Sequence, residues 1–402
     1  LANEIHTLPK DFNPHKRIKK IYNDRKQSIM DGKNIDWATA EALAFATLLK
    51  DGYGVRLSGQ DVGRGTFSHR HAVLYDQENE KRFVPLRHFR KEQALFEIVD
   101  SFLSEFGVLG FEYGYSQADP KTLVIWEAQF GDFSNGAQTI IDQFITTGER
   151  KWLRMSGLTL LLPHGHEGQG PEHTSSRVER FLQMCAEDNI QVANCTSPAN
   201  YFHILRRQMM RDFRKPLILM TPKSTLRHKA NTSPLSDFVN GSTFHRVLSN
   251  SINDNEIKNI NRIIFCSGKI YYELQDHINE LNLNNIYIIR LEQLYPFPYE
   301  ALKQGIKKFN QCEMIWCQEE PQNMGAWEFV EKRLKSVFNY IGSNNELYFI
   351  GRRAAASPAT GVFDRHLSNQ KNIIRLAIEA NLEEIKKEKS GVSLVKYKLP
   401  IE

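Results

Sequence analysis

Short apolar runs alternate with longer amphipathic segments along most of the chain. The apolar runs, which are rich in Val, Ile and Leu, lie at residues 55–58, 122–126, 158–162, 190–194 and 217–220. The segments around them predict helices at residues 37–49, 91–106, 137–147, 176–188 and 199–212. Because short buried strands joined by amphipathic helices form parallel, doubly wound sheets, the pattern predicts an α/β fold.

The alternation is interrupted at residues 221–256, which are rich in Pro, Asn, Ser and Gly. Such a break indicates a domain boundary. A second alternating unit follows, with strands predicted at residues 262–266, 286–290, 314–318 and 347–350. Residues 1–35 are basic and show little apolar periodicity. We therefore expect a basic linker arm at residues 1–35, a first domain at 36–250 and a second domain at 251–402.

Composition limits the class of protein. The 402 residues are 41% hydrophobic and 25% charged, as in ordinary globular proteins of two or three domains. No run is long enough to span a membrane, and the N-terminal residues do not resemble a signal peptide. The five cysteines form no C-x-x-C pair, which indicates reduced thiols in a cytoplasm-like compartment. A net charge of +5 suits anionic partners without requiring nucleic acid.

The first candidate for chemistry is Glu112, which lies between Phe111 and Tyr113 in a glycine-rich run. Phe130 and Phe133 follow after the next predicted strand. Burial of an acid among aromatic rings raises its pKa and makes it a proton donor or acceptor near neutral pH. The alternative is a partly solvated glutamate that caps a turn.

A second candidate is the loop at residues 163–176, PHGHEGQGPEHTSS. It carries His164, His166 and His173, and histidine is the natural proton shuttle at neutral pH. The His-x-His spacing with Glu167 suggests a metal site, but no H-E-x-x-H motif is present. We interpret the segment as an active-site loop, with a solvated loop as the alternative. No phosphate-binding loop or G-x-G-x-x-G motif occurs, so a nicotinamide cofactor has no support.

A series of motifs resembles the 2-oxoglutarate dehydrogenase family over about residues 35–380. In chain order they are GQDVGRGTFSHRH, FEYGYS, WEAQFGDFSNGAQ, PHGHEGQGPEHTSSR, SPANYFHILRRQ, PLILMTPKSTLRH, SGKIYYEL, RLEQLYPFP and CQEEPQNMGAWEF. The resemblance is to the C-terminal half only. It implies a transketolase-like pyrimidine-binding domain followed by a transketolase C-terminal-type domain, both doubly wound.

The resemblance also implies roles for the candidate residues. Glu112 matches the glutamate that bonds the aminopyrimidine ring of thiamine diphosphate and acts as a general acid and base. Phe130 and Phe133 match positions where aromatic side chains stack on that ring. His164 and His173 are candidates to move protons or to receive the lipoyl substrate.

Further residues are assigned to the same cleft or to a regulatory site. Gln60 and Asp61 are expected near the cofactor, and His69, His71 and His166 near the substrate or acceptor. A basic cluster is predicted to bind an allosteric adenine nucleotide or acetyl-coenzyme A, although an arginine-rich helix is more often a solvated or subunit-contact face. This cluster consists of Arg206, Lys223, Arg227 and His228.

One departure from the family pattern matters, because no G-D-G motif for diphosphate and Mg²⁺ is present. The metal ligands are therefore expected in an N-terminal half, and none is assigned to this chain. In the family the cofactor lies between subunits, which implies a homodimer and a half site here. The isolated chain is then expected to be inactive.

The predicted activity of the complete enzyme is oxidative decarboxylation of 2-oxoglutarate with transfer of the succinyl unit to the lipoyl group of the succinyltransferase component. The expected compartment is the bacterial cytoplasm, or the mitochondrial matrix in a eukaryote, with no nucleic-acid or membrane partner. The alternatives are a related 2-oxoacid decarboxylase, a transketolase relative, or a non-catalytic regulatory module. A nucleic-acid interaction would show steep salt dependence.

Overall fold

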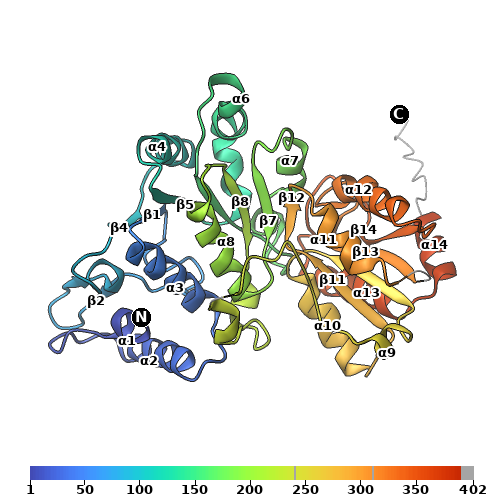
Figure 1. The fold of residues 1–402 in the computed structure, drawn as a ribbon, viewed down its shortest axis with the longest axis horizontal. Helices are drawn as coiled ribbons and strands as arrows, with labels where there is room; N and C mark the ends of the chain where they lie inside the picture. The colour runs from blue at the N-terminus through green and yellow to red at the C-terminus, as the bar shows by residue number, and fades with distance from the viewer. Residues whose placement is uncertain (240, 310–311, 391–402) are drawn as a thin grey trace, which may run out of the picture.

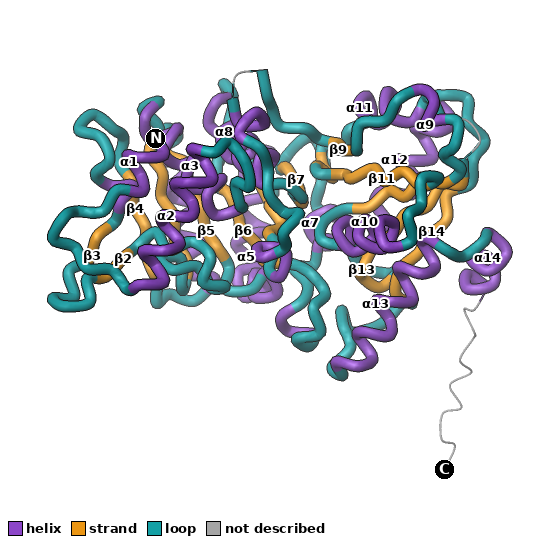
Figure 2. The backbone as a smooth tube through the Cα atoms, turned by 90° about the horizontal axis from the view of Figure 1, so that it is seen from below, coloured by secondary structure: helices purple, strands orange, loops and turns teal. Residues whose placement is uncertain are grey.

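The computed structural model describes residues 1–239, 241–309 and 312–390, and it contains two sheets that lie side by side in separate lobes (Figures 1 and 2). The first sheet has the strand order β12-β7-β8-β6-β5-β1-β4, and its strands are parallel except β12. These strands are β1 (Gly54–Gly59), β4 (Phe96–Asp100), β5 (Thr122–Glu127), β6 (Thr159–Pro163), β7 (Gln191–Asn194), β8 (Leu217–Thr221) and β12 (Gln293–Tyr295). A parallel sheet with this mixed order confirms the predicted α/β class.

The second sheet has the order β14-β13-β10-β11-β9, with β9 antiparallel at one edge. Its strands are β9 (Val247–Ser249), β10 (Arg262–Cys266), β11 (Ile286–Leu291), β13 (Glu313–Pro321) and β14 (Leu347–Arg352). A small hairpin is formed by β2 (Leu74–Tyr75) and β3 (Arg82–Phe83). The helices are α1 (Ala2–His6), α2 (Lys16–Met30), α3 (Trp37–Lys50), α4 (Glu105–Ala118), α5 (Gln138–Ile140), α6 (Gly148–Trp152), α7 (Val178–Gln183), α8 (Pro198–Met210), α9 (Asp254–Ile257), α10 (Ile270–Glu280), α11 (Tyr299–Ile306), α12 (Trp327–Tyr340), α13 (Phe363–Ile378) and α14 (Leu382–Ser390).

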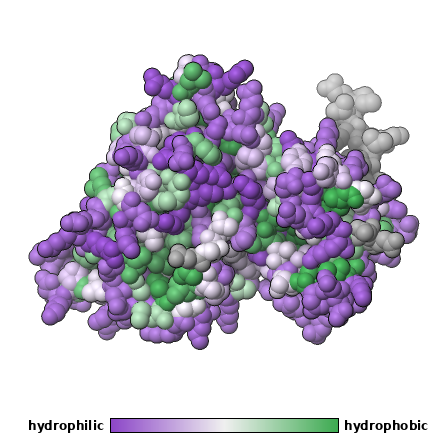
Figure 3. All heavy atoms as spheres, in the orientation of Figure 1, coloured by the Kyte–Doolittle hydropathy of each residue, from purple (hydrophilic) through white to green (hydrophobic). Residues whose placement is uncertain are grey.

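Both faces of the first sheet are buried. Along β5, Leu123 and Ile125 pack into the core shared with α3 and α8, whereas Val124 and Trp126 pack into the core shared with α4. The second of these cores continues without a break into the second lobe, where it includes Trp316. The continuous apolar runs that mark the strands in the sequence are therefore those expected for strands covered on both sides. The face of the molecule shown in Figure 3 is mainly hydrophilic, with smaller apolar patches.

The two lobes exchange strands, so a single cut at residue 250 does not separate them. The edge strand β12 comes from the C-terminal half of the chain and pairs with β7 of the first sheet. Conversely, β9 lies before residue 250 but pairs with β11 of the second sheet. The last part of the predicted 251–402 domain, residues 391–402, lies outside the described residues.

The prediction that residues 1–35 form a linker arm is wrong. These residues contain α1 and α2, and α2 buries Tyr22, Arg25 and Ile29 against the first lobe. Their spacing of three and four residues places them on one helix face. Three exposed lysines of the helix, Lys16, Lys19 and Lys20, conceal this stripe in the sequence.

The prediction of a helix at residues 91–106 is also wrong. Residues 96–100 form β4, which pairs in parallel with β1. The helix α4 begins only at Glu105, after Ser104 accepts a hydrogen bond from the backbone N–H of Gly107. The glycine-rich run around Glu112 is therefore the middle of a helix and not a turn. Among the described residues, no helix is both long and apolar enough to cross a membrane.

Candidate active site

The candidate site lies at one edge of the first sheet. The parallel strands β1, β5, β6 and β8 all end there, and ligands of open α/β sheets bind outside the carboxyl ends of the strands. Four predicted residues immediately follow these strands or lie a few residues beyond them: Gln60, Phe130, His164 and Lys223. The topology thus gathers segments that are far apart in the sequence.

Glu105 is the carboxylate of α4 that lies at this edge. It is the first residue of the helix, is partly buried, and accepts a hydrogen bond from Gln60 Nε2 at 3.1 Å. A carboxylate in the first turn of a helix is stabilised by the helix dipole. A Cβ atom at Gly136 would stand 3.3 Å from Glu105 Oε2, so the backbone passes close to the carboxylate and a larger residue would crowd it. Glu105 is not among the residues predicted from the sequence, although Ser104 followed by an acidic residue is a helix-start signal.

Glu112 occupies a different environment on the same helix. Its side chain is 1% exposed, and both oxygens are bound by Arg56, at 2.8 Å from Nε and 3.0 Å from Nη2. Arg56 also reaches Glu97, at 3.2 Å. At ~1.5 Å per residue, Glu112 lies about 10 Å below Glu105 along the helix. The geometry does not support a cofactor contact by Glu112, because its carboxylate is already occupied at a distance from the edge, and it favours Glu105 instead.

An aromatic cluster lines the edge next to α4. The ring of Phe130 lies 4.6 Å from the ring of His173, 6.2 Å from that of Phe133 and 5.4 Å from that of Phe67, each in an edge-to-face arrangement. Phe133 belongs to the short 3-10 helix Gly131–Ala137, whose far end reaches Glu105. The structure therefore brings together the predicted residues Phe130, Phe133 and His173.

The loop that carries His173 is held in place by the side chains of Asp132 and Lys223. Asp132 Oδ1 accepts hydrogen bonds from the backbone N–H groups of Thr174 and Ser175, whereas Asp132 Oδ2 is buried and has no partner among the described residues. Lys223 Nζ donates to the carbonyl oxygen of His173 at 2.5 Å and lies 4.0 Å from Glu167. Burial lowers the pKa of Lys223. Its position makes it a support of the loop rather than part of an effector site.

His164 and His166 are turned toward the second lobe. His164 Nδ1 accepts from the backbone N–H of Ser176 at 3.1 Å, and Nε2 lies 2.7 Å from Glu320. Since Nδ1 is an acceptor, Nε2 carries the proton and donates a hydrogen bond to Glu320. His166 is 1% exposed and its Nε2 lies 3.0 Å from the carbonyl oxygen of Pro358. Both histidines are therefore interdomain contacts, and the geometry does not support an acid–base role for His164 or an acceptor-cleft role for His166.

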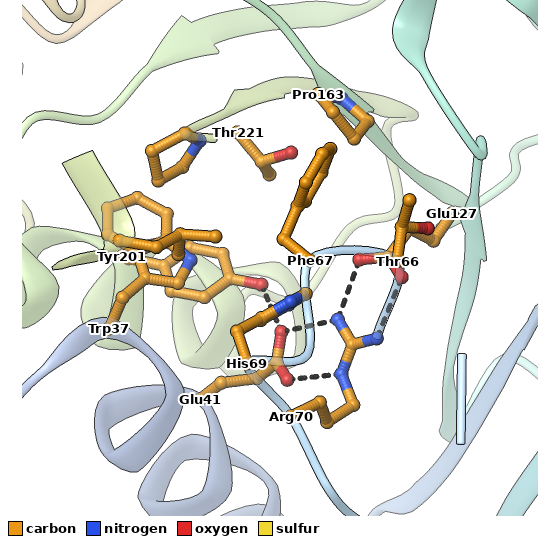
Figure 4. Close-up of a pocket in the computed structure, with 12 residues that line it drawn as sticks. Trp37, Glu41, Thr66, Phe67, His69, Arg70, Glu127, Pro163, Tyr201 and Thr221 are labelled. Carbon is orange, nitrogen blue, oxygen red and sulfur yellow. Dashed lines mark hydrogen bonds and ion pairs between the residues drawn. The ribbon is translucent and has the colours of Figure 1, made fainter. Parts of the chain in front are cut away.

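His69 and His71 lie on opposite sides of their loop. His69 lines a cavity of about 10 Å³ together with Phe67, Pro163 and Thr221 (Figure 4). His71 instead lines an open hollow of about 430 Å³ together with Asp61. The predicted single cleft for these three residues is thus two separate spaces, and only His69 faces the aromatic cluster.

The four residues of the predicted effector cluster are each engaged by a different partner. Arg206 pairs with Asp51 at 2.9 Å, and Arg227 donates to the carbonyl oxygen of Phe67 at 2.8 Å. His228 lies 3.1 Å from Asp276 of the second lobe. Together with the buried Lys223, these contacts do not support a common anion site.

The comparisons with known proteins agree with this architecture. The model of the transketolase pyrimidine-binding domain matches residues 33–229, and the model of the 2-oxoglutarate dehydrogenase C-terminal domain matches residues 232–378. The chain belongs to the 2-oxoglutarate dehydrogenase family. The 2-oxoglutarate dehydrogenase E1 components of Brucella abortus (strain S19), Brucella ovis and Brucella anthropi are each 55% identical to it over 377 residues. These matches cover 92% of this chain but only 38% of each relative, so the chain spans well under half of their length.

Proposed function

We propose that this chain supplies the pyrimidine-binding side and the C-terminal domain of a thiamine-diphosphate-dependent 2-oxoglutarate dehydrogenase. The observation that carries the proposal is the hydrogen-bonded pair of Glu105 and Gln60 beside the cluster of Phe130, Phe133 and His173. The similarity to E1 components supports the same reading. Because this chain spans 38% of those relatives, the activity is proposed for the longer protein.

The residues at the edge fit the ring end of the cofactor. Flat aromatic faces suit a heterocycle, and Glu105 and the unpartnered Asp132 Oδ2 are acceptors for ring or amino hydrogens. The Mg²⁺ ion and the diphosphate are proposed to bind residues outside this chain, because the sequence has no G-D-G motif. Thiamine diphosphate supplies the electron sink that lets a 2-oxo acid lose carbon dioxide.

The residues of this chain then have distinct tasks. Glu105 binds the aminopyrimidine group and exchanges a proton with it, and Gln60 fixes the orientation of that carboxylate. Phe130 and Phe133 exclude water from the ring. His173 meets the substrate or the incoming lipoyl group, because within the described structure neither of its ring nitrogens is engaged in a hydrogen bond. The acceptor is the lipoyl group of a succinyltransferase component.

We also propose a homodimer, because large apolar side chains are exposed together on and around α4. Exposed large apolar side chains on and around one helix favour a protein interface there. These residues are Phe102, Leu103, Phe106, Phe111, Phe144, Trp152, Leu153 and Met155. The bacterial relatives favour the cytoplasm as the compartment.

The proposal is tested by assaying the full protein with thiamine diphosphate, Mg²⁺ and ferricyanide as the electron acceptor. We expect decarboxylation of 2-oxoglutarate by the full protein and none by residues 1–402 alone. Pyruvate and a ketose phosphate serve as control substrates, and preferred turnover of either would favour a related decarboxylase or a transketolase. If no 2-oxo acid or ketose is turned over while the cofactor still binds, the regulatory alternative replaces the enzyme.

A further inference from the structure

The three residues of the His69–Arg70–His71 segment are held from outside by α2. Arg25 donates to the carbonyl oxygens of His69 and Arg70, the latter at 2.9 Å. Tyr22 donates its hydroxyl hydrogen to the carbonyl oxygen of His71 at 2.7 Å. Arg25 and Tyr22 are 7% and 5% exposed, so these hydrogen bonds are shielded from water. Three successive carbonyl groups of one loop are thus bound by two side chains of one helix.

The same segment is held from inside through Arg70. Its guanidinium donates to Glu41, at 2.5 and 3.0 Å, and to Glu127, at 2.6 and 2.7 Å (Figure 4). Glu41 also accepts the hydroxyl hydrogen of Tyr201 at 2.6 Å. Bidentate pairs of this kind fix direction as well as distance. The backbone on both sides of the His69 Cα atom is therefore immobilised between α2 and the sheet.

The charged groups around His69 are mainly cationic. Arg25 faces it from α2, Arg227 from the segment after β8, and Arg70 and His71 from its own loop. The nearest carboxylates, Glu41 and Glu127, are both engaged by Arg70. Burial, and then these positive charges, hold the pKa of His69 well below its usual range. Its Nδ1 atom is buried and has no partner in the described part of the chain.

We propose that α2 is a clamp for the active-site loop, in which Arg25 and Arg70 are positioning residues that present His69 at the cavity as an uncharged hydrogen-bond acceptor. An imidazole that stays uncharged can accept a hydrogen bond or a proton from a hydroxyl or thiol group in the cavity. The segment Ala2–Met30 is then part of the site, because it holds the active-site loop in place. The identity of the group that His69 meets rests on the proposed function, whereas the clamp does not.

The clamp is tested by labelling histidines of the full protein with diethyl pyrocarbonate as a function of pH. Only the uncharged imidazole reacts, so the midpoint of the labelling curve reports charge and the plateau at high pH reports access. Trypsin cleaves after Arg64 and Arg70, which places His69 and His71 on separate peptides with one histidine each. In the wild type, ordinary histidines become protonated and stop reacting as the pH falls. We expect His69 to keep the labelling rate of its own high-pH plateau to well below that pH.

Arg25→Met removes the charge and the two hydrogen bonds, and we expect the His69 midpoint to move to higher pH and the plateau to rise. Arg25→Lys keeps the charge, so its plateau should rise with little change in midpoint, and Tyr22→Phe should behave like Arg25→Lys. Arg17→Met, an exposed position of the same helix, is the matched control and should leave His69 unchanged.

An unchanged His69 midpoint in folded Arg25→Met would overturn the clamp. If Arg25→Met does not fold, an Arg25→Lys plateau equal to that of the wild type would overturn it instead. Neither readout uses decarboxylation, so a protein that fails the activity assay can still confirm or overturn the clamp.

Discussion

Two glutamates of α4, one in its first turn and one in its middle, lie in opposite environments. Glu105 stands at the carboxyl edge of the sheet, where it is partly buried, accepts one hydrogen bond from Gln60 and lies close to Gly136. Glu112 is two turns away, where Arg56 occupies both of its oxygens. A polar group that is fully paired inside a protein contributes to the structure, whereas one that is held in place but incompletely paired is available to a ligand. Under the proposed function, burial alone does not identify the catalytic acid.

The largest expected effect on stability is at the ion pair of Glu112 and Arg56. Arg56→Met leaves a buried carboxylate without its guanidinium, and such a loss destabilises a protein by about 3–5 kcal/mol. Urea unfolding of the wild type and of Arg56→Met measures the difference in their free energies of unfolding. The double variant Arg56→Met with Glu112→Met should recover most of the loss, because two apolar side chains replace the ion pair. A single variant as stable as the wild type would contradict the assignment of Glu112 as a structural residue.

His6 contrasts with Glu112, because it is buried without a charged partner. Burial lowers its pKa from the ordinary 6.5 to about 4, and its Nδ1 atom lies 3.1 Å from the carbonyl oxygen of Ala2. The unfolded chain binds this proton at higher pH than the folded chain does. Stability is therefore unaffected above pH 6.5 and falls as the pH drops from 6.5 toward 4, by on the order of 3 kcal/mol at the low end.

The His6 prediction is checked by unfolding at pH 7 and pH 4. His6→Gln should lose less stability than the wild type between these two values. His88→Gln, a substitution at an exposed position, should lose as much as the wild type. Equal losses in all three proteins would show that His6 is not held uncharged.

A smaller effect is expected at the contact between the lobes. Glu320 accepts the hydrogen bond of His164, and hydrogen bonds to charged groups contribute about 1.5–3 kcal/mol. Glu320→Gln should cost no more than this, because an amide oxygen can still accept. The His164→Asn change should cost a similar amount without a change in the pH profile of turnover. A pH profile that shifts with either substitution would restore His164 as an acid–base residue.

The smallest effect is expected on the exposed side of α4. A Cβ atom at Gly114 would meet nothing within 4 Å, and glycine is less favourable than alanine in a helix by about 1 kcal/mol. Gly114→Ala should therefore stabilise the monomer slightly in thermal unfolding. It should also weaken association if a second copy packs on this face. A destabilised monomer would contradict the open surface seen here.

Much of the fold followed from the sequence because buried parallel strands leave continuous apolar runs. The strands β1, β5, β6, β7 and β8 were predicted to within one or two residues at each end. The failures have physical causes. β4 is a short edge strand with exposed residues, so its pattern is weak, and α2 hides its buried stripe among lysines.

The candidate site was predicted in part, for a related reason. Phe130 and His173 are adjacent in space because β5 and β6 are neighbours in the sheet, which an α/β pattern anticipates. The choice between Glu105 and Glu112 required the starting residue of α4, and the sequence pattern places helix ends less accurately than helices themselves. The engagement of His164 and His166 by the second lobe depends on contacts across more than 150 residues. No local pattern contains that information.

The most direct test of the account compares the turnover of 2-oxoglutarate by the full protein carrying Glu105→Gln or Glu112→Gln, with circular dichroism as the check on folding. General acid–base groups contribute about 10²–10⁴-fold to rate, so we expect Glu105→Gln to lose turnover on that scale while remaining as stable as the wild type. Glu112→Gln should be less stable but should retain most of its turnover under conditions in which it is folded. A folded Glu112→Gln protein without activity, beside an active Glu105→Gln protein, would contradict the account.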